Sequence, residues 1–245
     1  MQPRGTPSKK MKKDQKNKIT VSQIKQSLDV AHLKPTATPA EITALAQTLR
    51  EEGYRYICVN SVHTALAADV LNGSKVGVVA CVGFPLGAVK TAAKVFETAA
   101  AIADGATEID MVLDLGSLFS GDLKQAEFDV REVVRAAEGR PVKVIIETPY
   151  LSMKQKVEAS KIVQGGGAAF VKTCSGASPD PIALYEDIRL IRRTVGPKMA
   201  IKASGRVGNF LRYMTMLEAG ADRVGLVLDQ AREILRGCEE QKGRL

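Results

Sequence analysis

The chain has 245 residues, which fits one large α/β domain or two small ones, and its 45% hydrophobic and 25% charged content is typical of a soluble globular protein. The net charge is +8, but residues 1–18 hold seven basic side chains against one acidic side chain, so most of the excess lies there. No apolar run is long enough to cross a bilayer. The chain has only two histidines, which excludes a histidine-rich metal site, and no tryptophan, which argues against broad base-stacking surfaces. We expect a basic, disordered tail over residues 1–18 and one domain over residues 19–245, with nucleic-acid contact or targeting as alternative roles of the tail.

Strand-like and helix-like segments alternate from residue 21 onward. A short amphipathic segment, 21–28, follows the N-cap candidate Thr20, and 29–33 is a first strand. Thr38, Pro39 and Glu41 form a capping pattern for a helix that ends near Gly53. The alternation continues with predicted strands at 56–60, 76–82, 108–113, 142–147, 170–173, 199–203 and 223–227, and predicted helices at 62–71, 89–104, 123–137, 152–164, 181–194, 209–219 and 231–240.

The predicted strands are short and rich in valine and isoleucine, as expected for a parallel sheet that is buried on both faces. Eight strand–helix units in about 220 residues match a closed (β/α)8 TIM barrel. An open, doubly wound sheet is the alternative, since alternation alone fits both. The count of eight and the missing G-x-G-x-x-G after the first strand favour the barrel.

The cysteines and the start of the chain indicate where the protein works. Four cysteines lie far apart without C-x-x-C spacing, which argues against a disulfide framework or a zinc site. The polar start has no apolar signal-peptide core. We therefore expect a cytoplasmic protein.

Polar residues interrupt several of the apolar strands, and the active site of such a barrel lies at the carboxyl ends of its strands. Lys172 and Lys202 fall on neighbouring strands at similar depth, and Asp110 lies inside another strand. Each ammonium group disfavours the other, so we expect one lysine pKa to fall towards neutrality. A neutral amine attacks carbonyl groups to form a Schiff base, and Asp110 could transfer protons.

Less specific interpretations remain for these residues. Either lysine could extend to solvent, pair with a carboxylate, or bind phosphate as a fixed charge. Glu147 fits a structural partner of a lysine as well as a catalyst. Cys58 and Asn60 are expected to line the pocket, and His32 is more typical of a structural or exposed position than of a ligand.

A set of motifs in this order and spacing resembles the deoxyribose-phosphate aldolase family of class I aldolases, over nearly all of residues 19–245. The motifs are Leu33-Lys34-Pro35-Thr36-Ala37-Thr38, Ile57-Cys58-Val59-Asn60, Val82-Gly83-Phe84-Pro85-Leu86-Gly87-Ala88 with Thr91, Lys94 and Glu97, Glu108-Ile109-Asp110-Met111-Val112, Val144-Ile145-Ile146-Glu147-Thr148, Phe170-Val171-Lys172-Thr173, and Ile201-Lys202-Ala203-Ser204-Gly205.

The resemblance implies a role for each residue of the catalytic set. Lys172 is similar to the family's Schiff-base lysine and Asp110 to its proton-relay aspartate, while Lys202 is similar to the second lysine, which lowers the pKa of its neighbour. The implied reaction is the reversible cleavage of 2-deoxy-D-ribose 5-phosphate to D-glyceraldehyde 3-phosphate and acetaldehyde. Because the imine is the electron sink, no metal or organic cofactor is implied. The implied partners are a sugar phosphate and acetaldehyde, with no membrane, nucleic acid only through the basic tail, and a homodimer as an open alternative.

The sequence departs from the family pattern where phosphate is gripped. Arg206 and Val207 follow Gly205 where the family has two adjacent glycines, and no hydroxyl residue follows Gly225. Retained but weaker phosphate binding is our expectation, with Arg206 and the helix that starts at Asn209 as donors. The alternative is an apolar pocket, formed by Leu226 and Leu228, for an unphosphorylated acceptor aldehyde. The expected substrate-binding residues are Gly205, Arg206, Gly225, Thr173 and Cys58. A non-catalytic nucleic-acid-binding protein on an aldolase scaffold is a further, less favoured hypothesis.

Overall fold

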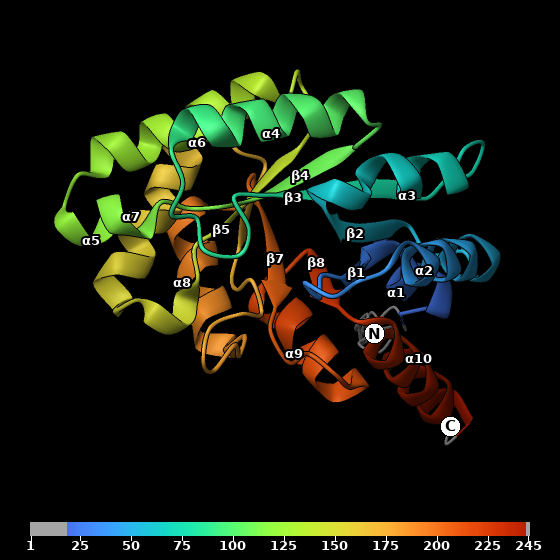
Figure 1. The fold of residues 1–245 in the computed structure, drawn as a ribbon. Helices are drawn as coiled ribbons and strands as arrows, with labels where there is room; N and C mark the ends of the chain where they lie inside the picture. Colours follow the sequence, from blue (N-terminus) through green and yellow to red (C-terminus); the bar gives the residue numbers. More distant parts are fainter. Residues whose placement is uncertain (1–18, 244–245) are drawn as a thin grey trace, which may run out of the picture.

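A computed structural model describes residues 19–243, and in this part of the chain eight parallel strands close into a barrel in sequence order. The helices form an outer ring around the strands (Figure 1). The predicted (β/α)8 barrel is therefore confirmed. The prediction of a disordered basic tail over residues 1–18 lies outside the described residues. The strands are β1 (Leu28–His32), β2 (Tyr56–Asn60), β3 (Gly77–Val82), β4 (Glu108–Val112), β5 (Val142–Ile145), β6 (Phe170–Lys172), β7 (Ala200–Ser204) and β8 (Arg223–Leu226).

Each strand is followed by helical structure that covers the outside of the barrel. Two single-turn 3-10 helices, η1 (Ser61–His63) and η2 (Thr148–Tyr150), follow β2 and β5. The α-helices are α1 (Val21–Ser27), α2 (Pro39–Glu52), α3 (Thr64–Val70), α4 (Thr91–Ala103), α5 (Leu115–Ser120), α6 (Leu123–Ala136), α7 (Met153–Gly165), α8 (Tyr185–Val195), α9 (Phe210–Ala219) and α10 (Leu228–Gly243).

Local capping explains why several helices begin and end where the sequence predicts. Thr38 accepts a hydrogen bond from the backbone N–H of Glu41, whose side chain accepts one from the backbone of Thr38, which completes the predicted capping box of α2. Gly53 ends that helix in the left-handed region, with φ of 75°. Thr20 caps α1 in the same way through Gln23.

The largest differences from the predicted boundaries lie next to the barrel mouth. The helix predicted from 181 begins at Tyr185, because the preceding segment bonds to the loop after β7: the N–H of Ala183 donates to the carbonyl of Gly205 at 3.0 Å. The final helix begins at Leu228, so Val227 alone connects it to β8. The short helix α5 was not predicted, and its N-cap is Asp114, whose carboxylate accepts a hydrogen bond from the backbone N–H of Ser117.

The apolar core lies between the strands and the helix ring, where valine, isoleucine and alanine from both layers are buried. It also encloses one ion pair. Lys94 of α4 donates to Asp129 of α6 at 2.6 Å and to the carbonyl of Val112 at 2.9 Å, and both side chains are buried. Lys94 belongs to the motifs that suggested the family, and this contact gives it a structural role: it joins two neighbouring helices to the end of β4.

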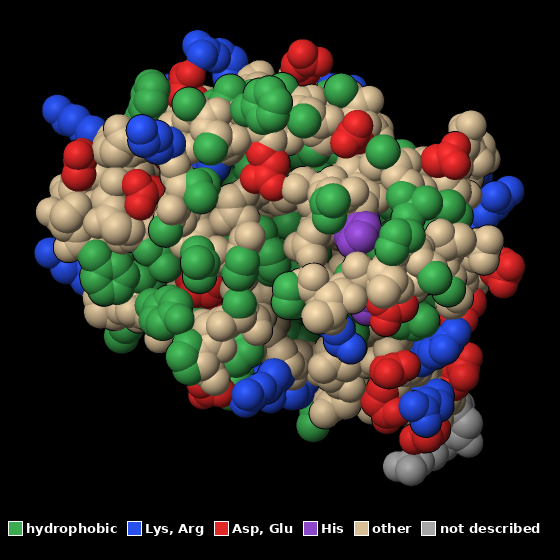
Figure 2. Space-filling model, in the orientation of Figure 1, with side chains coloured by type: hydrophobic (Ala, Val, Ile, Leu, Met, Phe, Trp, Pro, Cys, Tyr) green, Lys and Arg blue, Asp and Glu red, His purple; other side chains and the backbone are tan. Residues whose placement is uncertain are grey.

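The outer surface carries charges of both signs. Figure 2 shows lysine and arginine beside aspartate and glutamate around the edge of the visible face, and neither sign covers it. Within residues 19–243, no helix combines the length and the apolar character that crossing a bilayer requires.

Replacing Asp129 with asparagine tests the buried pair. The Asp129→Asn variant leaves the ammonium group of Lys94 buried without its counter-charge, so we expect the free energy of unfolding to fall by about 3 kcal/mol in urea titrations. The control is Glu158→Gln, which removes an exposed pair at 3.7 Å with Lys154 and should change stability little. Equal effects of the two substitutions would contradict the structural role of the buried pair.

Candidate active site

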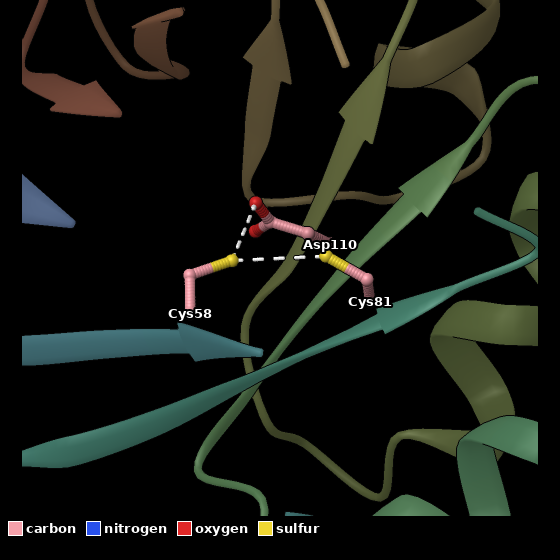
Figure 3. Close-up of side chains that lie close together, drawn as sticks. All are labelled: Cys58, Cys81 and Asp110. Atoms are coloured by element: carbon pink, nitrogen blue, oxygen red, sulfur yellow. Dashed lines mark hydrogen bonds between the residues drawn. The ribbon is translucent and has the colours of Figure 1, made fainter. Parts of the chain in front are cut away.

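The interior of the barrel is built from alternating strand residues that point inward. On the even-numbered strands, one layer contains Cys58, Asp110, Lys172 and Gly225, as the strand register places them. Figure 3 shows Asp110 of β4 pointing toward Cys58 of β2, with Cys81 of β3 beside it. This layer faces the carboxyl end of the barrel, where the active sites of such folds lie.

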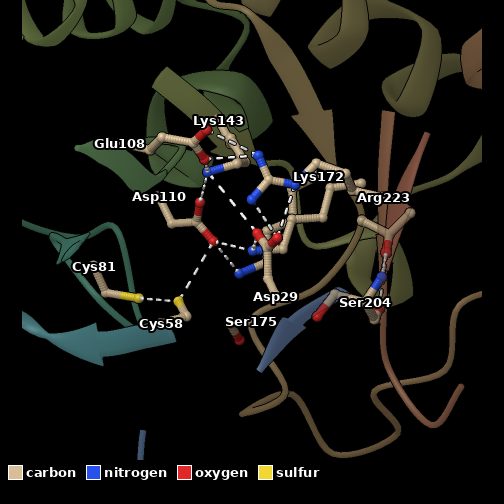
Figure 4. Close-up of polar contacts among 12 residues, drawn as sticks. Asp29, Cys58, Cys81, Glu108, Asp110, Lys143, Lys172, Ser175, Ser204 and Arg223 are labelled. Carbon is tan, nitrogen blue, oxygen red and sulfur yellow. Dashed lines mark hydrogen bonds and ion pairs between the residues drawn. The ribbon is translucent and has the colours of Figure 1, made fainter. Parts of the chain in front are cut away.

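Asp110 is the centre of this layer. Its Oδ2 atom accepts hydrogen bonds from the Nζ atoms of Lys172 and Lys202, each at 2.7 Å, and its Oδ1 atom accepts one from Lys143 at 3.0 Å. All four side chains are at most 2% exposed. Figure 4 shows Lys143 and Lys172 beside Asp110. The three predicted catalytic residues therefore lie together, with a third lysine that the sequence analysis did not single out.

Below this layer lies a second set of buried charges. Arg223 of β8 donates to both oxygens of Glu108 and to Asp29, which also pairs with Lys202 at 2.5 Å. Lys143 pairs with Glu108 at 2.5 Å. The guanidinium of Arg223 also stacks 3.6 Å from the ring centre of Tyr56, which closes the bottom of the barrel. The network thus holds four cations against three carboxylates.

The carboxylates set the protonation states of this network. Burial disfavours the charged form of Asp110, but Lys143, Lys172 and Lys202 outweigh burial and hold its pKa well below the usual range. Asp29 has a lowered pKa for the same reason, through Lys202, Lys143 and Arg223. Burial also disfavours the Lys202 ammonium, yet Asp110 and Asp29 raise its pKa above the usual value.

Mutual repulsion was expected to lower the pKa of one of the two lysines, and Lys202 is not that lysine, because the two carboxylates that flank it raise its pKa. Sequence reasoning missed Asp29 and Lys143, although the signal used for Lys172 was present: each is a charged residue within a strand that is buried on both faces.

A cavity of about 730 Å³ opens above the charged layer at the carboxyl ends of the strands. Four of the five expected substrate-binding residues line it: Cys58, Gly205, Arg206 and Gly225. Lys172 and Lys202 also line it, so both amines reach the space where a substrate would bind. Asn60 lines it as expected, and the wall includes further residues that sequence analysis did not assign to binding, namely Lys34, Ser175, Ser204 and Gln230.

Two of the glycines in the wall, Gly205 and Gly225, are required for different reasons. Gly205 has φ of 120°, and a Cβ there would lie 2.5 Å from the carbonyl oxygen of Pro181, so the loop after β7 could not pack against the 181–183 segment. A Cβ at Gly225 would lie 2.9 Å from Cε of Lys202. Gly225 therefore makes room for the lysine.

Of the remaining predicted residues, some line the cavity and others hold the loops and strands around it in place. Thr173 does not line the cavity; its hydroxyl donates to the carbonyl of Ser204 at 2.8 Å and so ties β6 to β7. Glu147, with φ of 53°, accepts from the N–H of Ser175 at 3.2 Å and so orients the loop after β6 rather than a lysine. Leu226 lines the cavity as expected, while Val227 takes the place proposed for Leu228.

Cys58, Cys81 and Asp110 offer three potential ligand atoms within 4.8 Å of one another. The donor set is unfavourable for a metal ion, because the oxygens of Asp110 already accept from three ammonium groups. A divalent cation would have to displace them and would add to an existing excess of positive charge. The residues present therefore do not fit a metal centre.

Buried lysines around a carboxylate at the mouth of a (β/α)8 barrel are typical of an enzyme that works through a lysine Schiff base. No family model matches the sequence. The chain is 46% identical to a deoxyribose-phosphate aldolase of Macrococcus caseolyticus, over 88% of this chain and 96% of the relative, and 42% identical to one of Thermococcus gammatolerans, over 82% and 91%.

Solved structures agree with the sequence comparisons. One described as the aldolase QR15 has a TM-score of 0.82 and 34% identity, covering 90% of this chain and 96% of that one. A deoxyribose phosphate aldolase from Aeropyrum pernix has a TM-score of 0.81 and 25% identity, covering 92% and 94%. The chain belongs to the deoxyribose-phosphate aldolase family and is a class I aldolase, hence a lyase.

The pH dependence of stability below neutral pH tests the buried ion pairs of Asp29. Because the pKa of Asp29 is lower in the folded protein than in the unfolded chain, its charge stabilises the fold at any pH above its pKa in the unfolded chain, near 4. This stabilisation is lost as the pH falls through the pKa of Asp29 in the folded protein. An Asp29→Asn variant should therefore be less stable than the parent at pH 7, with a difference that shrinks as pH falls below about 4. Urea titrations at several pH values measure this, and a difference independent of pH would contradict the ion pairs of Asp29.

Proposed function

We propose that the protein catalyses the reversible cleavage of 2-deoxy-D-ribose 5-phosphate to D-glyceraldehyde 3-phosphate and acetaldehyde, with Lys172 as the nucleophile. The observation that carries this proposal is the shared carboxylate: Lys172 and Lys202 each donate to Oδ2 of Asp110 at 2.7 Å, on the wall of the cavity. Relatives that are 40–46% identical over most of their length are named for this reaction.

The choice of Lys172 over its neighbour follows from the ion pairs. Among the described residues, Lys172 pairs with one carboxylate, whereas Lys202 pairs with two and Lys143 with three. Neutralising Lys172 therefore removes one ion pair and brings the network of four cations and three carboxylates into balance. Lys202 remains cationic, in keeping with its raised pKa, and so acts as a fixed charge and proton donor near the reacting atoms.

The reaction follows from an amine in that position. The Nζ atom of Lys172 adds to the aldehyde carbon, and the carbinolamine loses water to give an iminium ion. A base then takes the proton of the C3 hydroxyl, the C2–C3 bond breaks, and its electron pair moves toward the iminium nitrogen to leave an enamine. Protonation of the enamine carbon and hydrolysis of the imine release acetaldehyde and regenerate the amine. Asp110 is placed to relay these protons, directly or through water.

We further propose that the enzyme works in the cytoplasm. The cysteines of the described region are free thiols, which is typical of a reducing compartment.

Borohydride trapping tests the nucleophile. Acetaldehyde with borohydride should add an ethyl group, about 28 Da, to the Lys172 peptide, because reduction fixes the imine as a secondary amine. Lys172→Arg should lose the adduct and lower kcat by about 1,000-fold or more. The control is Lys94→Arg, a buried lysine outside the cavity, which should keep the adduct at Lys172. An adduct that persists in Lys172→Arg would refute the assignment.

Two basic residues of the cavity wall support retained phosphate binding. Arg206 and Lys34 line the cavity, and the ion pair between Arg206 and Asp180 joins two side chains that are 56% and 69% exposed, so an anion can replace the carboxylate at little cost. Leu226 and Val227 also line the cavity and are apolar, where hydroxyl groups are usual in the family. Phosphate binding is therefore expected to depend on charged side chains more than on hydroxyl donors.

Comparing a phosphorylated with an unphosphorylated substrate measures the contribution of phosphate binding. We expect kcat/KM to be higher for deoxyribose 5-phosphate than for deoxyribose, and Arg206→Gln to lower it about tenfold for the phosphorylated sugar alone, since a charged donor is lost. Equal kcat/KM for the two sugars in the parent enzyme would favour the alternative, an aldolase for unphosphorylated acceptors.

A further inference from the structure

Two thiols lie close to Asp110, and neither takes part in the bond-making or bond-breaking steps of the proposed reaction. Cys58 of β2 and Cys81 of β3 have their Sγ atoms 3.7 Å apart, and Figure 3 shows the two side chains pointing toward one another. We propose that this pair is an oxidation site for small hydroperoxides, in which the sulfur of Cys58 attacks the peroxide and Cys81 then closes a disulfide between β2 and β3.

The strand register brings the two thiols to the same side of the sheet. Cys58 lies opposite Val79 and Cys81 lies opposite Asn60, so the two cysteines are diagonal neighbours. A disulfide needs an S–S separation of about 2.05 Å, which is some 1.7 Å less than the separation here. The side chains are already directed at each other, but diagonal neighbours lie about 7–8 Å apart, so closing the bond also requires the backbones of β2 and β3 to move closer together.

The surroundings decide which thiol reacts first. Cys58 lines the cavity, and Cys81 is not among the residues that line it. The hydrogen bond with Cys81 lowers the pKa of the Cys58 thiol, aided by the charges of Lys202 and Lys172 and opposed by burial and Asp110. The same hydrogen bond, together with burial, raises the pKa of Cys81 well above the usual value. Cys58 is therefore the nucleophile and Cys81 the thiol that resolves it.

The chemistry balances with hydrogen peroxide as the oxidant. The Cys58 thiolate attacks one peroxide oxygen, the O–O bond breaks, and the departing hydroxide takes up a proton as water, which leaves a sulfenic acid. The sulfur of Cys81 then attacks the sulfur of Cys58, displaces a second water molecule and forms the disulfide. The protein loses two hydrogen atoms in all, and a thiol reductant restores both thiols.

Oxidation acts on the site through Asp110. The Sγ atom of Cys58 lies 3.8 Å from Oδ2 of Asp110, the oxygen that holds both lysines. A disulfide draws that sulfur toward β3 and removes its proton, so Asp110 loses one of its donors. The expected loss of aldolase activity rests on the proposed function, whereas the covalent bond does not.

Peptide mass spectrometry of the full-length protein tests the proposal. After treatment with hydrogen peroxide at neutral pH with a chelator present, we expect a linked Cys58–Cys81 peptide pair that is about 2 Da lighter than the two free peptides and that dithiothreitol reverses. In Cys81→Ala, Cys58 should instead accumulate as a sulfenic acid that dimedone traps. In Cys58→Ala, oxidation of Cys81 should slow by at least about tenfold.

The matched control is Cys174→Ser, which removes a thiol whose pKa burial raises to about 11 and which should form the linked pair at the parent rate. Absence of the linked pair in the parent protein, or unchanged oxidation of Cys81 in Cys58→Ala, would overturn the proposal. So would protection of both thiols from iodoacetamide by zinc ions, which would identify a metal site instead. The mass shift is measured without substrate, so a failure of the aldolase assignment leaves this test unaffected.

Discussion

The carboxylate of Asp110 is the interaction on which the rest of the site depends. It accepts from three lysines on three neighbouring strands, and each of those ammonium groups would be costly to bury without it. In return, the three positive charges keep Asp110 ionised inside the barrel. The arrangement explains how one protein interior tolerates several lysines, and why two of them reach the cavity side by side.

The closed barrel makes this arrangement possible. Strands buried on both faces exclude water from their inward side chains, so the charges interact at low dielectric and their positions are fixed by the strand register. Small residues complete the packing, as Gly225 does by leaving space for the chain of Lys202. The lower set of charges, centred on Arg223, anchors Asp29 and Glu108 and so holds the upper layer from beneath. The chemistry at the cavity thus rests on a scaffold of ion pairs rather than on one isolated reactive residue.

Much of this could be predicted from the sequence, and the limits have physical causes. The count of eight alternating strand–helix units, with no G-x-G-x-x-G after the first strand, favoured the barrel over an open sheet, and charged residues inside strands pointed to Asp110, Lys172 and Lys202. The raised pKa of Lys202 could not be predicted in the same way, because it depends on Asp29 and on the register that places Asp29 beside Lys202. The late start of α8 was missed for a similar reason: Ala183 bonds to Gly205, which is remote in sequence. Local sequence patterns therefore predict the helices and strands, whereas the pKa values of buried groups depend on contacts between strands and loops that are distant in sequence.

The most direct test of the account is the rate at which the enzyme exchanges the methyl protons of acetaldehyde with deuterium oxide, followed by NMR. Exchange requires both an imine on Lys172 and a group that removes the proton beside it, and Asp110 is assigned the relay of that proton. The account predicts rapid exchange with the parent enzyme and exchange slower by about 100-fold or more in Asp110→Asn. Exchange at the parent rate in a folded Asp110→Asn variant would contradict the central role of this carboxylate.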